Sequence, residues 1–479
     1  VGERGHLTWE WQPGIRLRGW AHPALFAAFY AALRAVGLDS RWAVAYGPRM
    51  LQGALAGLGD WAVFRLGART LGPRGARVSL LVQAGSWFYA YAAVRPFSNS
   101  LECVLSALAL AFWPLGAGQV GPGAPRRDRR IALGFAAAAV IARPSAAIFW
   151  LFLGGAHLAS CRPFLQAGLR DLCIGDVLPI GLASLALMVA IDWLGYGEFT
   201  FVPFNFVRLN LLEGVSSEYG THRWWWYFGE CFPTVLSGWL PLFLVGAAQS
   251  LRGGGAIRAA RRPVATLAAF VCWGLAVMSL SAHKELRFAL PLLPAAHVVA
   301  AAGYLALEQR YSKLCRRFMV LVLAAHAVVG AFLAGFHQRA PAPLMDWLAD
   351  PATNATFVDF YTRCHATPFF SHVHGTGVRR MRFLDCSPAV QALLNVPGMG
   401  HSARDGIEEE DRFFDDPVEF WTSRFAREDD KPSHMVITTE KVNDSAVAWA
   451  AQSLGMELCA TFPHTFDDAF LVLCRAPAA

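Results

Sequence analysis

Long apolar runs alternate with short polar, mostly basic segments along the first two thirds of the chain. An α-helix needs about 20 apolar residues, roughly 17 to 25, to cross the hydrocarbon core of a bilayer. Because backbone polar groups must be paired inside lipid, runs of this length predict helices. The pattern indicates a polytopic helical membrane protein. We expect spans at 44–64, 78–94, 100–116, 172–194, 231–250, 264–281, 287–306 and 318–336.

Two apolar stretches do not fit a simple crossing. The stretch 131–157 is too long for one crossing and too short for two, and Arg143-Pro144 interrupts it. Since proline removes a helical hydrogen bond, we expect a pair of broken or re-entrant half-helices here. Residues 21–38 are apolar but short, and we expect them to lie in the membrane interface.

The pattern changes after residue 336, where polar residues mix with short apolar runs. HMVITTEK and DAFLVLCR are typical of strands, and SAVAWAAQSLG is typical of a helix. We interpret the acidic run EEEDRFFDD as a solvated loop. The resulting division is a first segment 1–43 (the remainder of a loop, with an interfacial helix), a transmembrane helical domain 44–336, and a small α+β domain 337–479.

Composition supports a membrane protein. The chain has 479 residues, of which 55% are hydrophobic and 16% charged, which is unusual for a soluble protein of this size. The net charge of +7 divides into −8 for residues 337–479 and +15 for residues 1–336. The basic excess lies in short segments between spans, so it does not indicate nucleic-acid binding.

The basic segments predict the orientation, because cytosolic loops are enriched in Lys and Arg. If 131–157 is a hairpin, all four segments lie on the cytosolic side. The lumenal side then receives 1–43, 95–100, 195–230, the loop around residue 285 and the whole tail. The four segments contain Arg65, Arg69, Arg74 and Arg77; Arg126, Arg127, Arg129 and Arg130; Arg252, Arg258, Arg261 and Arg262; and Arg310, Lys313, Arg316 and Arg317.

The strongest candidate for chemistry is His283-Lys284-Glu285-Leu286-Arg287-Phe288, which lies between two apolar runs. Charge at a membrane boundary is costly unless it is solvated, paired or used. We expect Lys284 and Arg287 to hold a phosphate, with Glu285 orienting one of them or a sugar hydroxyl. The alternative is a cluster of interfacial side chains that only anchors two spans.

A second candidate is the aromatic segment 201–233, which separates two predicted spans. Its flat rings and amides are typical of surfaces that bind sugar rings, and the alternative is an aromatic belt at the headgroup level. The residues that we expect to bind substrate here are Asn205, Tyr219, His222, Trp224 and Trp226.

A third cluster combines the stretch from Arg95 to Glu102 with the Arg143-Pro144 break. We expect structural roles for both, namely an ion pair at a span end and a helix kink. Replacing Glu102 by alanine should therefore reduce stability rather than activity.

The tail contains possible disulfides and glycosylation sites. Its four cysteines, Cys364, Cys386, Cys459 and Cys474, allow three pairings in an oxidising compartment. Asn354 and Asn443 begin Asn-X-Ser/Thr triplets. No CxxC pair or His/Cys spacing predicts a metal site.

HKELRF followed by a proline-rich apolar span resembles the HKE-x-RF signature of glycosyltransferase family 22. These are membrane mannosyltransferases of the endoplasmic reticulum that have the GT-C fold and use dolichyl-phosphate mannose. The resemblance extends from about residue 5 to 390. Within the family, the sequence is similar to the branch that adds the third mannose to glycosylphosphatidylinositol. The stretches that carry it are LTWEW, RLRGW, RPFSNSLE, DWLGYGEFTFVPFNF, EYGTHRWWWYFGECFP, CHATPFFSHVH and MRFLDCSP.

The resemblance implies an inverting transfer of mannose from the lipid phosphate to a 2-hydroxyl of the acceptor, forming an α1,2 linkage. Such a transfer needs a base for the hydroxyl and cationic stabilisation of the departing phosphate. The implied partners are dolichyl-phosphate mannose, the glycosylphosphatidylinositol precursor and the bilayer, with neither a cofactor nor a metal. The resemblance adds His283, Trp9 and Glu10 to the candidate site residues.

The family's catalytic Asp-Glu pair follows its first span, and neither Glu3 nor Glu10 matches it. We therefore expect this pair upstream of Val1, which leaves the catalytic residue unassigned and predicts that these residues alone are inactive. Alternative functions are a related mannosyltransferase of N-glycan assembly, or a lipid or sugar transporter. Two mutational expectations follow: Arg287→Ala should abolish activity, and Lys284→Ala should mainly weaken donor use.

Overall fold

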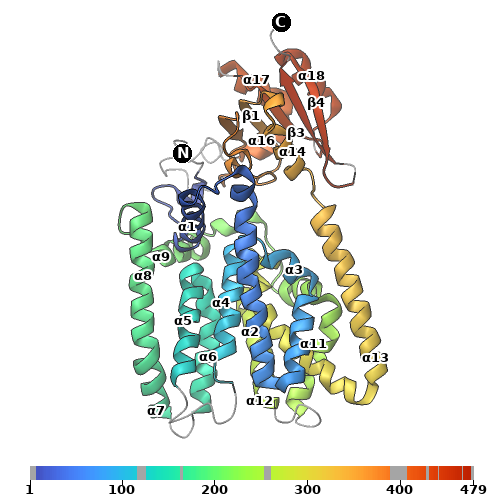
Figure 1. The fold of residues 1–479 in the computed structure, drawn as a ribbon. Helices are drawn as coiled ribbons and strands as arrows, with labels where there is room; N and C mark the ends of the chain where they lie inside the picture. Colours follow the sequence, from blue (N-terminus) through green and yellow to red (C-terminus); the bar gives the residue numbers. More distant parts are fainter. Residues whose placement is uncertain are drawn as a thin grey trace.

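The computed structural model describes residues 7–115, 126–161, 165–252, 260–388, 407–427, 431–440, 442–466 and 468–475. A bundle of long helices carries a smaller part, built from helices and a sheet, at one end (Figure 1). Glu3 and Arg258 lie outside the described residues. The helices of the bundle are α1 (Ala21–Ala35), α2 (Arg41–Ala84), α3 (Trp87–Ala93), α4 (Ser98–Phe112), α5 (Arg126–Ala142), α6 (Ala147–Ser160), α7 (Leu165–Leu169), α8 (Leu178–Tyr196), α9 (Val202–Val207), α10 (Phe232–Leu236), α11 (Leu240–Arg252), α12 (Arg261–Met278) and α13 (Leu293–Gly335).

Four helical segments within the described residues are long and apolar enough to cross a membrane, so the chain is a multi-pass membrane protein. They contain three of the predicted crossings completely (172–194, 231–250 and 287–306) and most of two others (264–281 and 318–336). Apolar helices of fewer residues are Ser98–Phe112 and Pro144–Ser160. The four segments are Leu165–Tyr196, Tyr227–Arg252, Arg261–Met278 and Leu286–Gly335.

Two of the predicted loops are sharp bends within helices instead. Spans 44–64 and 78–94 were expected to be separate, but α2 continues from Arg41 to Ala84 with a break at Gly72. Gly72 has φ 78°, a left-handed conformation that glycine adopts without steric cost. Likewise, α13 (Leu293–Gly335) joins most of spans 287–306 and 318–336 in one helix, which bends at Tyr311. The first residues of span 287–306 belong to a 3₁₀ turn that precedes it. The basic residues at these bends therefore lie on helical turns.

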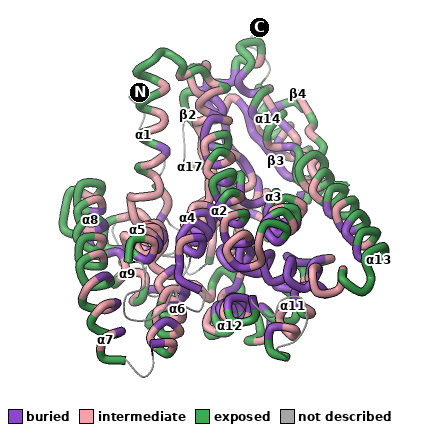
Figure 2. The backbone as a smooth tube through the Cα atoms, turned by 60° about the horizontal axis from the view of Figure 1, so that its bottom comes forward, coloured by how far each residue is buried: buried purple, intermediate pink, exposed green. Residues whose placement is uncertain are grey.

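Helix α1 lies across the bundle rather than along it. In Figure 1 the long helices run up and down the picture, while α1 is foreshortened. After the 60° rotation of Figure 2, α1 is seen along its length. Phe26 is its buried residue, and most of its other side chains are exposed or half-buried. The structure confirms a helix within 21–38, and its place in the membrane interface stays a prediction.

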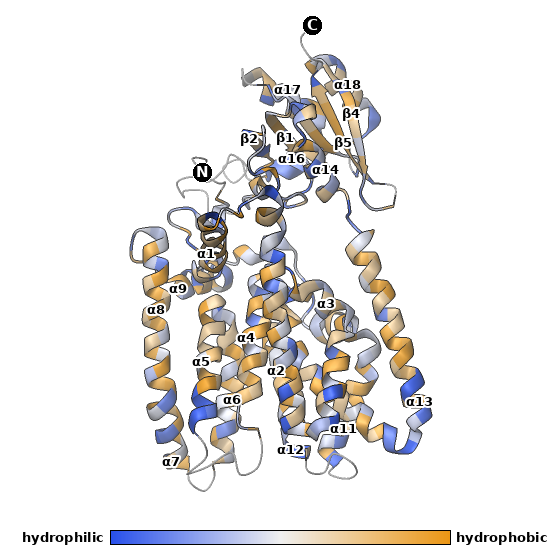
Figure 3. Ribbon diagram, viewed as in Figure 1, coloured by the Kyte–Doolittle hydropathy of each residue, from blue (hydrophilic) through white to orange (hydrophobic). Residues whose placement is uncertain are grey.

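The stretch 131–157 forms two helices, α5 and α6, which are separated at Arg143-Pro144 as predicted. The basic segments gather at the end of the bundle away from the sheet, where hydrophilic residues are concentrated (Figure 3). Ion pairs connect them across helices: Arg65 lies 3.8 Å from Asp128, and Arg74 lies 2.7 Å from Glu308. The hairpin explains why these segments share one end.

The tail contains a five-stranded mixed sheet, which confirms the α+β prediction. Its strand order is β2-β1-β3-β5-β4, in which β1 pairs parallel with β2 and β3, and β5 pairs antiparallel with β3 and β4. Two clusters of buried apolar side chains give the tail a core of its own. The strands are β1 (Phe357–Tyr361), β2 (Arg380–Phe383), β3 (His434–Thr438), β4 (Met456–Pro463) and β5 (Ala469–Arg475), and the helices are α14 (Pro341–Leu348), α16 (Glu409–Asp415), α17 (Pro417–Arg427) and α18 (Asp444–Leu454).

The acidic run is not the solvated loop that we expected. Residues Glu409–Asp415 form α16, whose Phe413 is fully buried in the tail core. The carboxylate of Glu410 accepts hydrogen bonds from the backbone N–H of Cys364 (2.9 Å) and from Arg363 (3.1 Å), while Glu409 pairs with Arg424. Acidic residues in the first turn favour a helix because they face its positive end.

The structure selects one of the three possible disulfide pairings. Cys364 pairs with Cys386, and Cys459 pairs with Cys474, each with a Cα–Cα distance of 6.0 Å. The Asn443 side chain caps α18 by accepting a hydrogen bond from the N–H of Ala446 at 2.9 Å. The Asn354 side chain is exposed on a left-handed turn.

Replacing both Cys364 and Cys386 by serine should destabilise the tail by about 3 kcal/mol, because the bond closes a loop of 22 residues that would otherwise be free in the unfolded chain. Chemical denaturation followed by a tail-specific probe would measure this change. The single Cys272→Ser variant, at an exposed unpaired cysteine, is the control. An unchanged midpoint for the double variant would contradict the prediction.

Candidate functional site

The HKELRF motif lies in the connection between α12 and α13. Its first residues are held against the loop before α10: the N–H of His222 donates to the carbonyl of Ala282 (3.0 Å), and His283 Nδ1 contacts the carbonyl of Gly220 (3.1 Å). Its last residues form a 3₁₀ turn, Leu286–Leu292, that leads into α13. The two candidate segments of the sequence are therefore neighbours.

Lys284 ties the two segments together. Its side chain is almost fully buried, with 3% of the residue exposed, and burial lowers its pKa. The ammonium group donates to the backbone carbonyls of His222 (3.0 Å) and Ser281. An ammonium has three donors, and these carbonyls occupy most of them. This geometry favours a positioning role for Lys284, and the expected contact with a phosphate remains a prediction.

Glu285 contacts Arg287. This agrees with the expectation that Glu285 orients one of the two cations of the motif. Arg287 Nη2 donates to Glu285 Oε1 at 2.7 Å, and its Nε lies 2.6 Å from Oε2, so the guanidinium and the carboxylate are in contact at two points. His283 Nε2 approaches the same carboxylate at 3.2 Å. Burial alone would raise the pKa of Glu285, but the hydrogen bonds from His283 and Arg287 lower it overall. The Arg287 side chain remains 43% exposed, so its other N–H groups can reach a ligand.

Arg143 joins this site from the break between α5 and α6. It forms an ion pair with the buried Glu102 at 3.0 Å, and its Nη1 donates to Ser98 Oγ at 3.0 Å. Its guanidinium lies 5.6 Å from the centre of the Phe288 ring, and that of Arg287 lies 6.0 Å from the same ring. The cluster formed by the Arg95–Glu102 stretch and the Arg143-Pro144 break therefore adjoins the HKELRF motif. The sequence analysis did not predict this proximity.

A third arginine completes the cluster. Arg18 Nε donates to Glu10 Oε1 at 3.0 Å, and the charge of Arg18 acts on Arg143 together with that of Arg287. Each of the three guanidinium groups has a glutamate partner, namely Glu10, Glu102 or Glu285. A guanidinium has five N–H donors and a carboxylate uses two of them, so such a cluster can still bind a phosphate.

Aromatic rings line the approach to the cluster. The ring of Trp9 stacks on Tyr219 at 6.3 Å, and Tyr219 lies edge-on to His283 at 6.0 Å. His222 stacks on Trp226 at 4.5 Å. Of these expected sugar-binding rings, Trp9 and Trp226 are buried.

Tyr219 and Trp224 are exposed, at 47% and 73%, and His222 is exposed as well. These three rings are accessible to a ligand. Asn205 instead holds the backbone, because its amide donates to the carbonyl of Arg16 at 3.1 Å.

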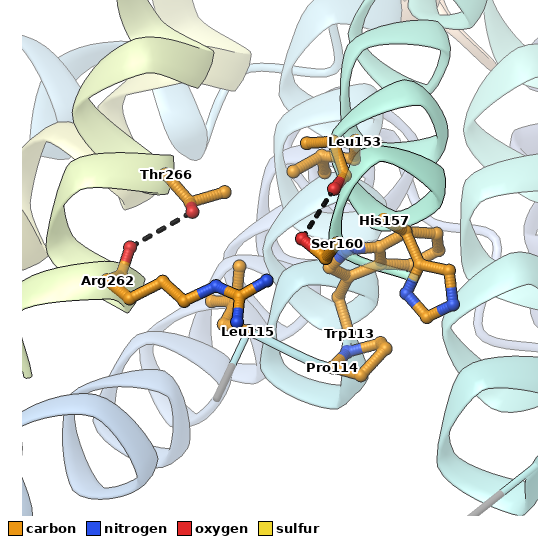
Figure 4. A pocket seen from close by; sticks show the side chains of 9 residues that line it. Trp113, Pro114, Leu115, Leu153, His157, Ser160, Arg262 and Thr266 are labelled. Atoms are coloured by element: carbon orange, nitrogen blue, oxygen red, sulfur yellow. Dashed lines mark hydrogen bonds between the residues drawn. The ribbon is translucent and has the colours of Figure 1, made fainter. Parts of the chain in front are cut away.

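A small pocket lies at the other end of the bundle, between α4, α6 and α12 (Figure 4). Its volume is only about 20 Å³, which is room for a water molecule. Ser160 donates to the carbonyl of Ala156 (2.8 Å) and Thr266 to that of Arg262 (3.0 Å), so both hydroxyl groups are satisfied within their own helices. This pocket is not a candidate substrate site.

The His283–Glu285 contact predicts a pH dependence of stability. The hydrogen bond to Glu285 raises the pKa of His283 above its usual value near 6.5. The stabilisation should be complete below that value and be lost as pH rises through the raised pKa. Since the pair is partly exposed, the effect should be below about 1 kcal/mol.

Thermal unfolding of the wild type and of His283→Gln across pH 5 to 9 would measure how much the His283–Glu285 contact contributes to stability. The difference in Tm should be largest at low pH and shrink as pH rises. A difference that grows with pH would contradict the assigned direction.

Comparisons with known proteins support a glycosyltransferase. Residues 1–374 match the model of the Alg9-like mannosyltransferase family. The chain is 30% identical over 466 residues to GPI alpha-1,2-mannosyltransferase 3 of Bos taurus, covering 96% of this chain and 79% of that protein. It is 33% identical over 487 residues to GPI mannosyltransferase 3 of Yarrowia lipolytica, covering 97% and 87%.

The fold is similar to the crystal structure of ArnT from Cupriavidus metallidurans bound to undecaprenyl phosphate, with a TM-score of 0.57 and 14% sequence identity. That similarity covers 96% of this chain and 89% of ArnT. The likeness shows the GT-C fold, which agrees with the fold class expected from the sequence.

Proposed function

Since the chain belongs to the Alg9-like mannosyltransferase family, we propose that it adds the third mannose to the glycosylphosphatidylinositol precursor. The donor is dolichyl-phosphate mannose and the product is an α1,2 linkage. The two relatives named GPI mannosyltransferases above match more than nine tenths of the chain at 30% and 33% identity, which supports this acceptor over others in the family.

The observation that carries the proposal is the exposed guanidinium of Arg287, fixed in place by Glu285 and adjacent to Arg143. When the glycosidic bond to mannose breaks, negative charge develops on the departing lipid phosphate. Preorganised cations stabilise that charge without reorganising during the reaction. Arg287 holds the phosphate, Arg143 adds a second charge, and Glu285 and Lys284 keep the loop in register.

The acceptor hydroxyl needs a base, and we assign none here. The three carboxylates of the cluster, Glu10, Glu102 and Glu285, each pair with an arginine. For Glu285, the hydrogen bonds from His283 and Arg287 lower its pKa, which makes it a weaker base. We therefore assign these three carboxylates the role of positioning their arginines.

We further propose that the protein lies in the endoplasmic reticulum membrane with the site and the tail in the lumen. Two disulfides in the tail fit an oxidising compartment. The basic bends at the opposite end fit the cytosolic side. Substrates with long lipid tails would reach the site from the bilayer.

Lipid analysis of cells that lack the protein tests this function. We expect a glycosylphosphatidylinositol precursor with two mannoses to accumulate, and the wild-type gene to restore the third. Accumulation of a truncated lipid-linked oligosaccharide would assign the protein to N-glycan assembly instead. Movement of mannosyl lipid across vesicles without sugar transfer would indicate a transporter.

A further inference from the structure

A cavity of about 280 Å³ lies at the boundary between the bundle and the tail. It is lined by Tyr30 of α1, Arg49 of α2, the segment Arg95 to Phe97, and His372 of the tail. Parts of the chain that are far apart in sequence therefore enclose it. The mechanism proposed above uses none of the polar groups in this cavity.

Two positive charges in the cavity, Arg49 and Arg95, have no carboxylate partner among the residues that the structure describes. Arg95 packs over the ring of Tyr91 at 3.9 Å and donates to its carbonyl at 3.3 Å. Within the described part of the chain, neither Arg49 nor Arg95 forms an ion pair with Asp or Glu, in contrast to Arg18, Arg143 and Arg287. Like charges placed together destabilise a fold, so an anion would relieve them.

The other polar side chains that line the cavity, Tyr30, Ser371 and His372, include no carboxylate. His372 is about nine-tenths buried, and its Nδ1 contacts Ser371 Oγ at 3.0 Å. Burial and then the charge of Arg49 lower its pKa, so it is neutral near pH 7. Asp346 lies nearby but is paired with Arg41 at 2.7 Å. The cavity is therefore cationic overall.

The helix beside the cavity is suited to contact lipid. Trp42 and Met50 of α2 are 60% and 61% exposed. Trp42 lies seven residues before Arg49, which places both on the same face of the helix. Exposed tryptophan is typical of the headgroup level of a membrane. A ligand of this cavity can thus keep its acyl chains in the bilayer.

The cavity adjoins the candidate active site through one ring. Phe97 lines the cavity, and its ring centre lies 5.6 Å from the guanidinium of Arg287. The donor's phosphate must meet Arg287, since its bond to mannose breaks there. An acceptor's phosphodiester, by contrast, is separated from its reacting hydroxyl by several sugars and needs a different cationic site.

We propose that Arg49 and Arg95 bind the phosphodiester of the acceptor glycolipid, while its glycan passes Phe97 to reach Arg287. This assignment rests on the proposed function and deepens it, because it names where the acceptor's lipid phosphate lies. The acyl chains would follow the exposed face of α2 around Trp42. The two sites then hold the two lipid phosphates of the reaction separately.

Steady-state kinetics of the double variant Arg49→Gln/Arg95→Gln tests the assignment. With donor saturating, the KM for the acceptor should rise at least about ten-fold. This is the loss of affinity expected when a charge-assisted hydrogen bond to the phosphate is removed. The KM for the donor should stay within two-fold. Arg49→Lys/Arg95→Lys keeps both charges and should restore most of the affinity. Arg34→Gln, an exposed arginine at the end of α1, is the matched control.

A second readout separates this inference from the proposed function. Native mass spectrometry of the wild type in detergent should show bound phosphatidylinositol, and the double glutamine variant should lose it. Loss of binding would support the phosphate site even if mannose transfer went to another acceptor. A raised donor KM instead, or unchanged acceptor KM and lipid binding in a folded variant, would overturn the assignment.

Discussion

Arg287→Ala is expected to lower mannose transfer by at least about 100-fold, because it removes a preorganised donor to the departing phosphate. The protein should still fold, since Arg287 is 43% exposed and Glu285 would keep its contact with His283. Transfer from dolichyl-phosphate mannose in isolated membranes, normalised to the amount of protein, measures the effect.

Two variants make this result interpretable. Arg287→Lys keeps the charge but loses the bidentate geometry, so we expect it to recover only part of the activity. Arg34→Ala removes an exposed arginine far from the motif in sequence and should have no effect. If Arg287→Ala merely lowers the protein level in proportion to activity, the motif anchors the loop and has no role at the phosphate.

Glu102→Ala should cost roughly 3 to 5 kcal/mol of stability, because it leaves the Arg143 guanidinium buried without its counter-ion. Glu102 is 2% exposed, so its removal leaves the Arg143 guanidinium away from bulk water. A loss of this size exceeds what many proteins can tolerate, so the variant should be degraded in cells. Protein abundance and the thermal unfolding midpoint in detergent measure it.

The double variant Glu102→Met/Arg143→Met separates stability from catalysis. Apolar residues of similar volume can replace a buried ion pair at little cost, so the fold should recover. Activity should stay low, because the second cation near Phe288 is absent. A double variant that is both stable and fully active would confine Arg143 to a structural role.

The sequence determined the membrane domain and its general arrangement, since the hydrophobic pattern reports what each segment must bury. Apolar runs of bilayer length located the helices, and Pro144 located the break between α5 and α6. The basic segments at Gly72 and near Tyr311 were predicted to be loops on one side of the membrane, and the structure shows them as bends within helices. At the first bend, Gly72 takes up the left-handed conformation and Pro73 follows it directly, so the chain reverses without a longer loop.

The sequence also identified HKELRF, because four ionisable residues between apolar runs are too costly to be incidental. Within the motif it could not distinguish Lys284, which is buried under carbonyls, from Arg287, which faces outwards. Both are cations within two residues of Glu285, and the local pattern carries no information on burial.

Only the tertiary structure showed that Arg18, Arg143 and Arg287 converge, each with its own glutamate. Within the pairs the partners lie 8, 41 and 2 residues apart, but the three pairs come from separate parts of the chain. Such contacts depend on how separate helices pack, which a single sequence does not record. The same reason applies to the cavity at Arg49 and Arg95, whose walls come from the bundle and the tail together.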